Sequence, residues 1–135
     1  MKKELHSIML IDDDIAANYF HKIIIEDSQI CDEVKIFQSA LEALEYLNSL
    51  KQGNLQIPDL ILLDINMPRL DGWQFIEEYG RLDQARKDEI KVVMLTTSSN
   101  PRDRERAMGI EEIVDLIHKP LSVEKLQSLQ KKYYT

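Results

Sequence analysis

Short runs of apolar residues alternate along the chain with longer stretches in which apolar residues recur every three or four positions. A continuous apolar run is typical of a buried parallel strand, and the wider spacing is typical of an amphipathic helix. The expected strands lie at residues 8–11, 34–37, 60–63, 92–95 and 113–117, and the expected helices at residues 15–24, 41–47, 73–82, 101–109 and 121–131. This alternation predicts right-handed crossovers and a parallel sheet covered by helices on both faces.

Polar side chains stand at the ends of four of these expected strands. In open parallel sheets of this kind, the working site lies at the carboxyl ends of the strands. The polar residues are therefore predicted to meet on one rim: Asp12, Asp13 and Asp14 after the first strand, Asp64 after the third, Thr96 and Thr97 after the fourth, and Lys119 after the fifth.

Three of the rim acids need a cation if the fold brings them together. Carboxylates about 4 Å apart repel by roughly 4 kcal/mol per pair at an effective dielectric constant of 20. An all-oxygen set such as Asp12, Asp13 and Asp64 suits Mg²⁺, or Mn²⁺, which is commonly held together with phosphate oxygens. The acids therefore predict a Mg²⁺-dependent phosphate site, whereas Asp14 is interpreted as the cap of the first helix.

Asp64 also has the chemistry of a nucleophile. An aspartate beside a bound divalent ion can attack phosphorus and become an acyl phosphate. The attacked group must be neutralised from several sides, and Lys119 supplies a positive charge. The Thr96 hydroxyl and the backbone amides near Asn66 and Thr97 can donate to the remaining phosphoryl oxygens. A structural salt bridge from Lys119 to the acids is the alternative explanation of that lysine, and the two roles are compatible.

Four segments together resemble the receiver (response-regulator) domain of two-component phosphorelays. They are LIDDD at residues 10–14, LLDINMP at 62–68 followed by DG at 71–72, MLTT at 94–97, and HKP at 118–120. The resemblance extends from about residue 7 to residue 130. It implies an α/β, flavodoxin-like, doubly wound sheet of five parallel strands in the order 2-1-3-4-5, with five helices on both faces. Because the chain has 135 residues, we expect one receiver domain at residues 5–132 and no effector domain.

The resemblance also implies roles for the acids. Asp64 would be the phosphoacceptor, taking its phosphoryl group from a histidine kinase or a His-phosphotransfer protein. Asp13 and Asp64 would bind Mg²⁺ directly, together with the backbone carbonyl of Asn66. Asp12 would act on the ion through a water molecule.

For the rest of the rim the resemblance implies a switch, with two departures from the family pattern. Thr96 would be the switch hydroxyl, Lys119 the charge partner, and the backbones of Thr97 and Asn66 would bind the phosphoryl group. The family usually has an aromatic residue or His three positions before the lysine, where this chain has Leu116, so an aromatic flip cannot be the readout. Asp115 stands where the family often has Gly. Activation is then expected to run through the loop after the fourth strand and the fourth helix.

These residues predict a signalling switch, a phosphorelay intermediate or a phosphate sink rather than an enzyme, although such a domain can phosphorylate itself from small donors and dephosphorylate itself. The alternative is an aspartyl-phosphate phosphohydrolase of the haloacid dehalogenase type. In that family the nucleophile follows the first strand in an Asp-x-Asp pattern, whereas Asp64 follows the third strand and Asn66 replaces the second acid. A flavin carrier is disfavoured because three aspartates after the first strand would repel the FMN phosphate.

The composition of the chain disfavours several classes of binding partner and of structural site. The net charge of −7 argues against nucleic acid, whose affinity comes from Lys and Arg. The one cysteine, Cys31, excludes a disulfide framework or a cysteine-rich zinc module. No apolar stretch approaches 18 residues, so no membrane insertion is expected and the predicted location is cytoplasmic. The downstream protein partner stays unknown, and the chain is expected to be a monomer or a phosphorylation-linked dimer.

Two packing predictions complete the sequence analysis. The apolar stripe of the first helix is predicted to be core: Ile15, Ala16, Tyr19, Phe20, Ile23 and Ile24. Trp73 is predicted to be a partly exposed residue at the start of the third helix. Arg102, Arg104 and Arg106 alternate with acids and are predicted to form a solvated helix face.

Overall fold

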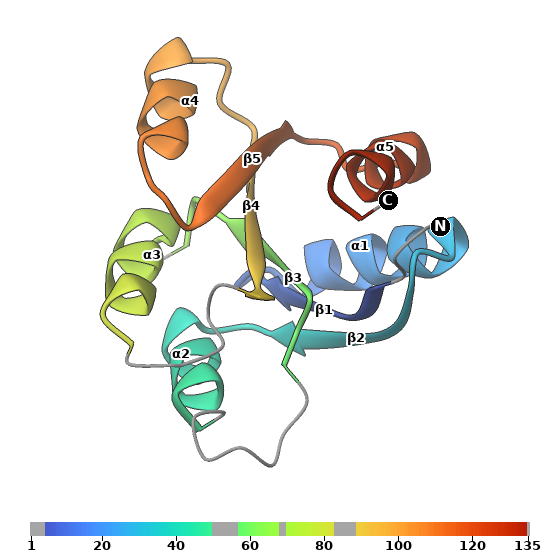
Figure 1. Ribbon diagram of the computed structural model, residues 1–135, viewed down its shortest axis with the longest axis horizontal. Helices are drawn as coiled ribbons and strands as arrows, with labels where there is room; N and C mark the ends of the chain where they lie inside the picture. Colours follow the sequence, from blue (N-terminus) through green and yellow to red (C-terminus); the bar gives the residue numbers. More distant parts are fainter. Residues whose placement is uncertain (1–4, 50–56, 68–69, 83–88, 135) are drawn as a thin grey trace.

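The computed structural model describes residues 5–49, 57–67, 70–82 and 89–134, which form a five-stranded parallel sheet flanked by helices (Figure 1). The strand order β2-β1-β3-β4-β5 confirms the prediction. The strands are β1 (Leu5–Ile11), β2 (Cys31–Phe37), β3 (Leu60–Asp64), β4 (Lys91–Thr96) and β5 (Ile113–His118). The helices are α1 (Ile15–Ser28), α2 (Ala40–Ser49), α3 (Gly72–Gly80), α4 (Pro101–Met108) and α5 (Val123–Tyr133).

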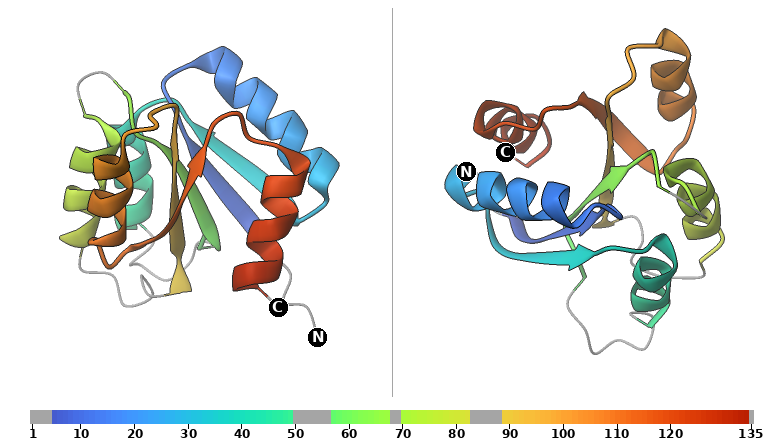
Figure 2. Two further views of the ribbon diagram at one scale, coloured as in Figure 1. Left: turned by 90° about the horizontal axis from the view of Figure 1, so that it is seen from above. Right: turned by 180° about the vertical axis from the view of Figure 1, so that it is seen from behind.

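The sheet separates two hydrophobic cores. Helices α1 and α5 cover one face, and α2, α3 and α4 cover the other (Figure 2). Neighbouring residues of β1 point to opposite cores: Ile8 and Leu10 pack on the α1 and α5 side, and Met9 and Ile11 on the other side. Because both faces are covered, the central parts of the inner strands β1, β3 and β4 are apolar on both sides, which explains the continuous apolar runs in the sequence.

The helices begin at residues that satisfy their free backbone N–H groups. Asp14 caps α1 by accepting from the N–H groups of Ala16 and Ala17, as predicted. Asp71 and Gln74 form a reciprocal capping box at the start of α3. Helix α1 is longer than the expected residues 15–24, and β1 and β2 each begin three residues earlier than expected.

The prediction for the apolar stripe of α1 is wrong for its largest side chains. Ile15, Tyr19, Phe20 and Ile23 are 66%, 69%, 55% and 40% exposed. The buried face of α1 is instead formed by Asn18, His21, Ile25 and Ser28. The two sets follow parallel helical stripes, so the three-to-four spacing indicates a face but does not say which face is covered.

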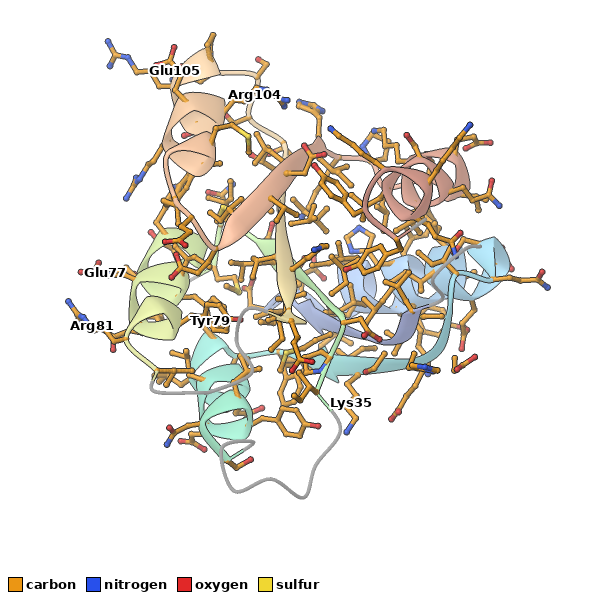
Figure 3. The ribbon with its side chains drawn as sticks, in the orientation of Figure 1. Lys35, Glu77, Tyr79, Arg81, Arg104 and Glu105 are labelled. Atoms are coloured by element: carbon orange, nitrogen blue, oxygen red, sulfur yellow. The ribbon has the colours of Figure 1, made fainter. Side chains whose placement is uncertain are left out.

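The prediction for Trp73 is also wrong. Its side chain is buried, and the guanidinium carbon of Arg106 from α4 lies 4.2 Å from the centre of its ring. Arg106 therefore covers α3 instead of belonging only to a solvated face. Tyr79 of the same helix is buried toward the sheet, whereas Arg81 and Glu77 form an ion pair on the outer side (Figure 3).

Some predicted features fall outside the described residues. They are the turn that the Lys-Gln-Gly-Asn sequence at residues 51–54 predicts, Pro68 of the second motif segment, and most of the polar segment at residues 84–91 that is predicted to be a helix end and a loop. Within the described part of the chain, none of the helices has the length and apolar character that crossing a membrane requires.

Candidate functional site

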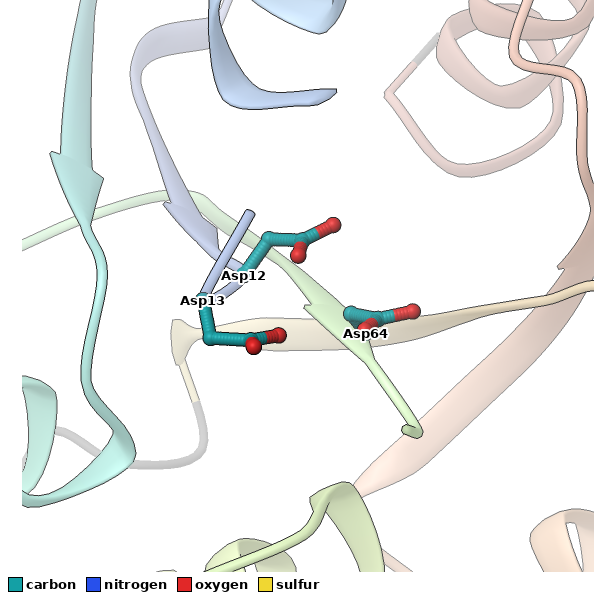
Figure 4. Close-up of side chains that lie close together, drawn as sticks. All are labelled: Asp12, Asp13 and Asp64. Atoms are coloured by element: carbon teal, nitrogen blue, oxygen red, sulfur yellow. The ribbon is translucent and has the colours of Figure 1, made fainter. Parts of the chain in front are cut away.

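The three acids are brought together by the register of the central strands. Ile11 of β1 is paired with Leu63 of β3, so the next residues, Asp12 and Asp64, emerge side by side at the carboxyl edge. Asp13 follows in the loop before α1. Carboxylate oxygens of the three residues lie within 4.8 Å of one another (Figure 4). The predicted convergence of Asp12, Asp13 and Asp64 is therefore present in the structure.

The loop that carries the first two acids is held from three directions. The backbone N–H of Asp12 donates to the carbonyl of Phe37 at 3.1 Å, which ties the loop to β2. The Asp12 carboxylate accepts from the N–H of Asp14 at 3.0 Å. Its carbonyl accepts from the side-chain amide of Asn18 at 2.7 Å, inside the protein. Asp12 is therefore a rigid, buried carboxylate, whereas Asp13 is exposed at the mouth of the site.

Lys119 supplies the positive charge of the site, as predicted. Its Nζ lies 2.8 Å from Oδ1 of Asp64 and 3.5 Å from Oδ2 of Asp12. Burial by itself lowers the pKa of Lys119, but the hydrogen bond and charge of Asp64, with the charge of Asp12, outweigh burial. The pKa of Lys119 is therefore raised above its ordinary value, and the side chain is a cation at neutral pH.

The Asp64 carboxylate is buried, with 5% of the residue's surface exposed. Burial raises its pKa, the hydrogen bond from Lys119 opposes that rise, and the charges of Asp12 and Asp13 add to it. The net shift is upward. Because the negative charge of Asp64 is unfavourable in this environment, a cation beside the carboxylate would stabilise its charged form.

A small open cavity of about 270 Å³ lies over Asp64. Its lining brings together most of the predicted site: Asp12, Asp13, Asp14, Ala17, Asp64, Asn66, Thr97 and Lys119. Thr96 is not among these residues. It is buried, its Oγ1 accepts from the N–H of Ser98 at 2.9 Å, and its carbonyl accepts from the N–H of Lys119 at 2.7 Å. Leu116 is half-buried and packs against the core under α2, α3 and α4.

The residues of this cavity fit a hard divalent cation. Asp12, Asp13 and Asp64 each offer a carboxylate oxygen, and oxygen ligands of this kind are the ones that Mg²⁺ prefers. The buried Oδ2 of Asp12 has no hydrogen-bond partner among the described residues and only the 3.5 Å ion pair with Lys119. The carboxylates carry three negative charges against one ammonium, so a cation would reduce their repulsion.

Gly72 is a structural residue of the site that the sequence analysis did not identify as such. A Cβ at this position would lie 2.7 Å from the Cα of Ile65 and 2.8 Å from the carbonyl oxygen of Asp64. The N–H of Gly72 also donates to the carbonyl of Ile65 at 2.8 Å. The start of α3 therefore lies directly against the end of β3, and only glycine allows that approach. The Asp-Gly pair at residues 71–72 was the available signal.

Comparison with known proteins gives one consistent family. The model of the response regulator receiver domain matches residues 8–131. A two-component response regulator from Cytophaga hutchinsonii of known structure is 31% identical, with a TM-score of 0.87 over 96% of this chain and 97% of that chain. The response regulator Rcp1 from Synechocystis is 34% identical over 99 residues, which are 71% of this chain and 65% of that protein.

The match to a further relative covers only part of each of the two proteins. The probable methanogenesis regulatory protein FilR2 from Methanothrix harundinacea is 35% identical over 85 residues, which are 63% of this chain. The chain spans about half the length of that curated relative, at 53%.

Proposed function

Because the chain belongs to the response-regulator receiver family, we propose that it is a Mg²⁺-dependent phosphoacceptor that receives a phosphoryl group on Asp64. The donor would be the phosphohistidine of a histidine kinase or a His-phosphotransfer protein. The observation that carries the proposal is the buried Asp64 carboxylate, 2.8 Å from the Lys119 ammonium and within 4.8 Å of two further acids.

Asp64, the metal-binding residues and Lys119 each have a separate part in this transfer. An oxygen of Asp64 attacks phosphorus, the P–N bond of the phosphohistidine breaks, and its electron pair returns to the imidazole, which takes up a proton. Mg²⁺ held by Asp13, Asp64 and the backbone carbonyl of Asn66, with Asp12 acting through a water, would neutralise charge on the phosphoryl oxygens. The Lys119 ammonium contacts the Asp64 carboxylate before the reaction. As the phosphoryl group is transferred, the same ammonium would contact the phosphoryl oxygens and stabilise their negative charge.

Thr96 needs a rearrangement to take the role of switch hydroxyl. Its Oγ1 accepts a hydrogen bond from the backbone N–H of Ser98, which leaves the hydroxyl hydrogen able to donate to another group. Because Thr96 does not line the cavity, its side chain would have to turn for that hydrogen to reach the phosphoryl group. The backbone N–H of Thr97, whose residue lines the cavity, is available to the same group. With Leu116 at the usual aromatic position, the signal would pass through the loop after β4 and through α4.

The donor protein must place its phosphohistidine within bonding distance of Asp64, so it must rest on the rim of the cavity. The exposed side chains Ile15, Tyr19, Phe20 and Ile23 begin directly after Asp14, which lines that cavity. We include in the proposal that this α1 stripe is the docking face of the donor. Apolar contacts of this kind stabilise protein complexes when they are buried.

The phosphohydrolase alternative is not favoured. The family match covers most of the chain, and Asn66 offers no second acid beside Asp64. We propose a signalling switch at residues 5–132 rather than an enzyme. Its downstream protein, its oligomeric state and a cytoplasmic location stay predictions.

Incubation with acetyl phosphate and Mg²⁺, followed by intact-mass measurement, tests the acceptor. We expect one labile phosphoryl group on the wild type and on Asp14→Asn, a matched substitution of a rim acid that keeps the helix cap. We expect none on Asp64→Ala and none without divalent cation. Labelling of Asp64→Ala would overturn the assignment, and steady turnover of small phosphomonoesters would favour the phosphohydrolase.

The docking face has a separate test with any phosphorylated histidine kinase that labels the wild type. The double substitution Tyr19→Glu and Phe20→Glu should slow this transfer at least about tenfold, the equivalent of about 1.4 kcal/mol. Labelling by acetyl phosphate should be unchanged, because the cavity is intact. Equal kinase rates for the variant and the wild type would exclude the α1 stripe as the docking face.

A further inference from the structure

Hydrogen bonds from two directions hold the backbone of the segment that carries Lys119. Nζ of Lys125 donates to the carbonyl oxygens of both His118 and Pro120, each at 2.7 Å. Nδ1 of His118 lies 2.7 Å from the carbonyl oxygen of Lys119. The backbone N–H of Lys119 donates to the carbonyl oxygen of Thr96 at 2.7 Å. One ammonium thus holds the backbone on both sides of the residue that contacts Asp64.

The position of Lys125 in its own helix points to a role outside that helix. Ser122 caps α5 by accepting from the N–H of Lys125 at 3.2 Å, which makes Lys125 the third residue of the helix. At this position Glu or Gln completes a capping box, as Gln74 does in α3. A cation is moreover unfavourable at the positive end of a helix. The ammonium of Lys125 turns back to the segment before the helix, where carbonyl oxygens compensate its charge.

We propose that Lys125 is a positioning residue for Lys119 in the phosphoryl-transfer reaction. By fixing the carbonyls at His118 and Pro120, it fixes the backbone from which the Lys119 side chain reaches Asp64 at 2.8 Å. The inference rests on the proposed function, because the position of the Lys119 ammonium matters for the rate of phosphoryl transfer to Asp64. A small displacement of a catalytic group can lower the reaction rate strongly, even when the binding of the substrate changes little.

A purely structural role of Lys125 predicts a different outcome. If Lys125 only stabilised the start of α5, its loss would lower the unfolding temperature and leave the transfer rate unchanged. Lys132 provides a matched control on the same helix, because its ammonium lies 3.5 Å from Asp115. Asp115 and Lys132 lie outside the set of residues that lines the cavity over Asp64. Lys125 is half-buried and lines an open groove between β5 and α5, so its replacement leaves both cores intact.

The test compares the wild type with Lys125→Met, Lys125→Arg and Lys132→Met in the acetyl phosphate assay, at varied donor and Mg²⁺ concentrations. We expect Lys125→Met to lower the maximal rate about tenfold, while the Mg²⁺ concentration for half-maximal labelling stays within about twofold. Lys125→Arg should restore most of the rate, because guanidinium also donates to two acceptors. Lys132→Met should match the wild type. Thermal unfolding of each variant confirms that it is folded.

Three results would overturn the inference. They are a maximal rate for Lys125→Met within about twofold of the wild type, an equal loss in Lys132→Met, and a parallel rise in the Mg²⁺ requirement. The outcome is separable from that of the proposed function, since unlabelled wild-type protein would overturn the function itself and this inference with it.

Discussion

Helices α1 and α3 both begin in loops that carry site residues, but they bury opposite kinds of side chain. Helix α3 buries Trp73, Phe75, Ile76 and Tyr79 against the sheet and its neighbouring helices. Helix α1 exposes most of its large apolar side chains and buries polar ones. The same helical spacing of apolar residues therefore serves packing in one helix and an outer surface in the other.

The neighbours of each helix explain this difference. The inner face of α1 near the site meets the loop of Asp12, whose carbonyl needs a hydrogen-bond donor, and Asn18 supplies it. His21 follows on the same buried face, close enough to Lys119 and Asp12 for their charges to affect it. The start of α3 instead meets backbone atoms of Asp64 and Ile65, so a glycine and apolar residues suit it. In α1, the polar residues that face the Asp12 loop take the inner side of the helix, and its large apolar residues lie mostly on the outer side.

The largest expected effect tests this contrast directly. Phe75 is fully buried, so Phe75→Ala should lower the free energy of unfolding by about 3–5 kcal/mol. Phe20 is 55% exposed, so Phe20→Ala should change it by less than about 0.5 kcal/mol. Urea unfolding followed by circular dichroism measures both. Comparable losses in the two variants would mean that the α1 stripe is covered in solution.

A second substitution probes why α3 lies where it does. Gly72→Ala would place a methyl group against the backbone of Asp64 and Ile65, and overpacking of this kind costs about 1–3 kcal/mol. The loop after Asp64 should shift with it, so labelling by acetyl phosphate should also slow. Gly109→Ala is the matched control, because its Cβ would meet ordinary contacts at 3.5 Å. A normal unfolding free energy for Gly72→Ala would show that α3 can move away without cost.

The convergence of Asp12, Asp13, Asp64 and Lys119 was predictable from sequence because the carboxyl ends of parallel strands share an edge. That geometric rule needs only the strand positions, which the apolar runs give. The strand order was predicted from the resemblance to the receiver family, and the pairing of neighbouring strands in the structure confirms it.

The covered face of α1 was not predictable in the same way. Periodicity identifies residues on a common face, whereas burial depends on the elements that pack against it, here α5 and the Asp12 loop. The hydrogen bonds of Lys125 could not be predicted from the sequence either. A lysine in the first turn of a helix can direct its ammonium to several acceptors, and the sequence does not say which one it reaches. The Arg106–Trp73 contact depends on the placement of α4 over α3, which neither helix encodes alone.

The polar inner face of α1 should give stability a pH dependence. Burial, followed by the charge of Lys119, lowers the pKa of His21, although Asp12 and Asp14 oppose this shift. Below about pH 6.5 the unfolded chain takes up a proton that folded His21 refuses. Stability should therefore fall as the pH falls from about 6.5 to the folded-state pKa, by at most about 1.4 kcal/mol per pH unit from this group.

Urea unfolding at pH 7.5, 6.5 and 5.5, without Mg²⁺, measures this dependence. His21→Gln should lose less stability between pH 6.5 and 5.5 than the wild type, because it has no such proton to refuse. Parallel curves for His21→Gln and the wild type would show that His21 titrates alike in the folded and unfolded states.

The smallest expected effect concerns the cover of α3. Arg106 lies over the ring of Trp73, and an exposed cation–π contact contributes about 0.5–1 kcal/mol, so Arg106→Ala should cost about that much. Trp73 is the one tryptophan of the chain, so its fluorescence reports this site alone. Loss of the guanidinium should admit water to the ring and shift the emission to longer wavelength, whereas Arg104→Ala should not. An unchanged emission would mean that α3 is buried by the sheet alone, and that its contrast with α1 does not depend on α4.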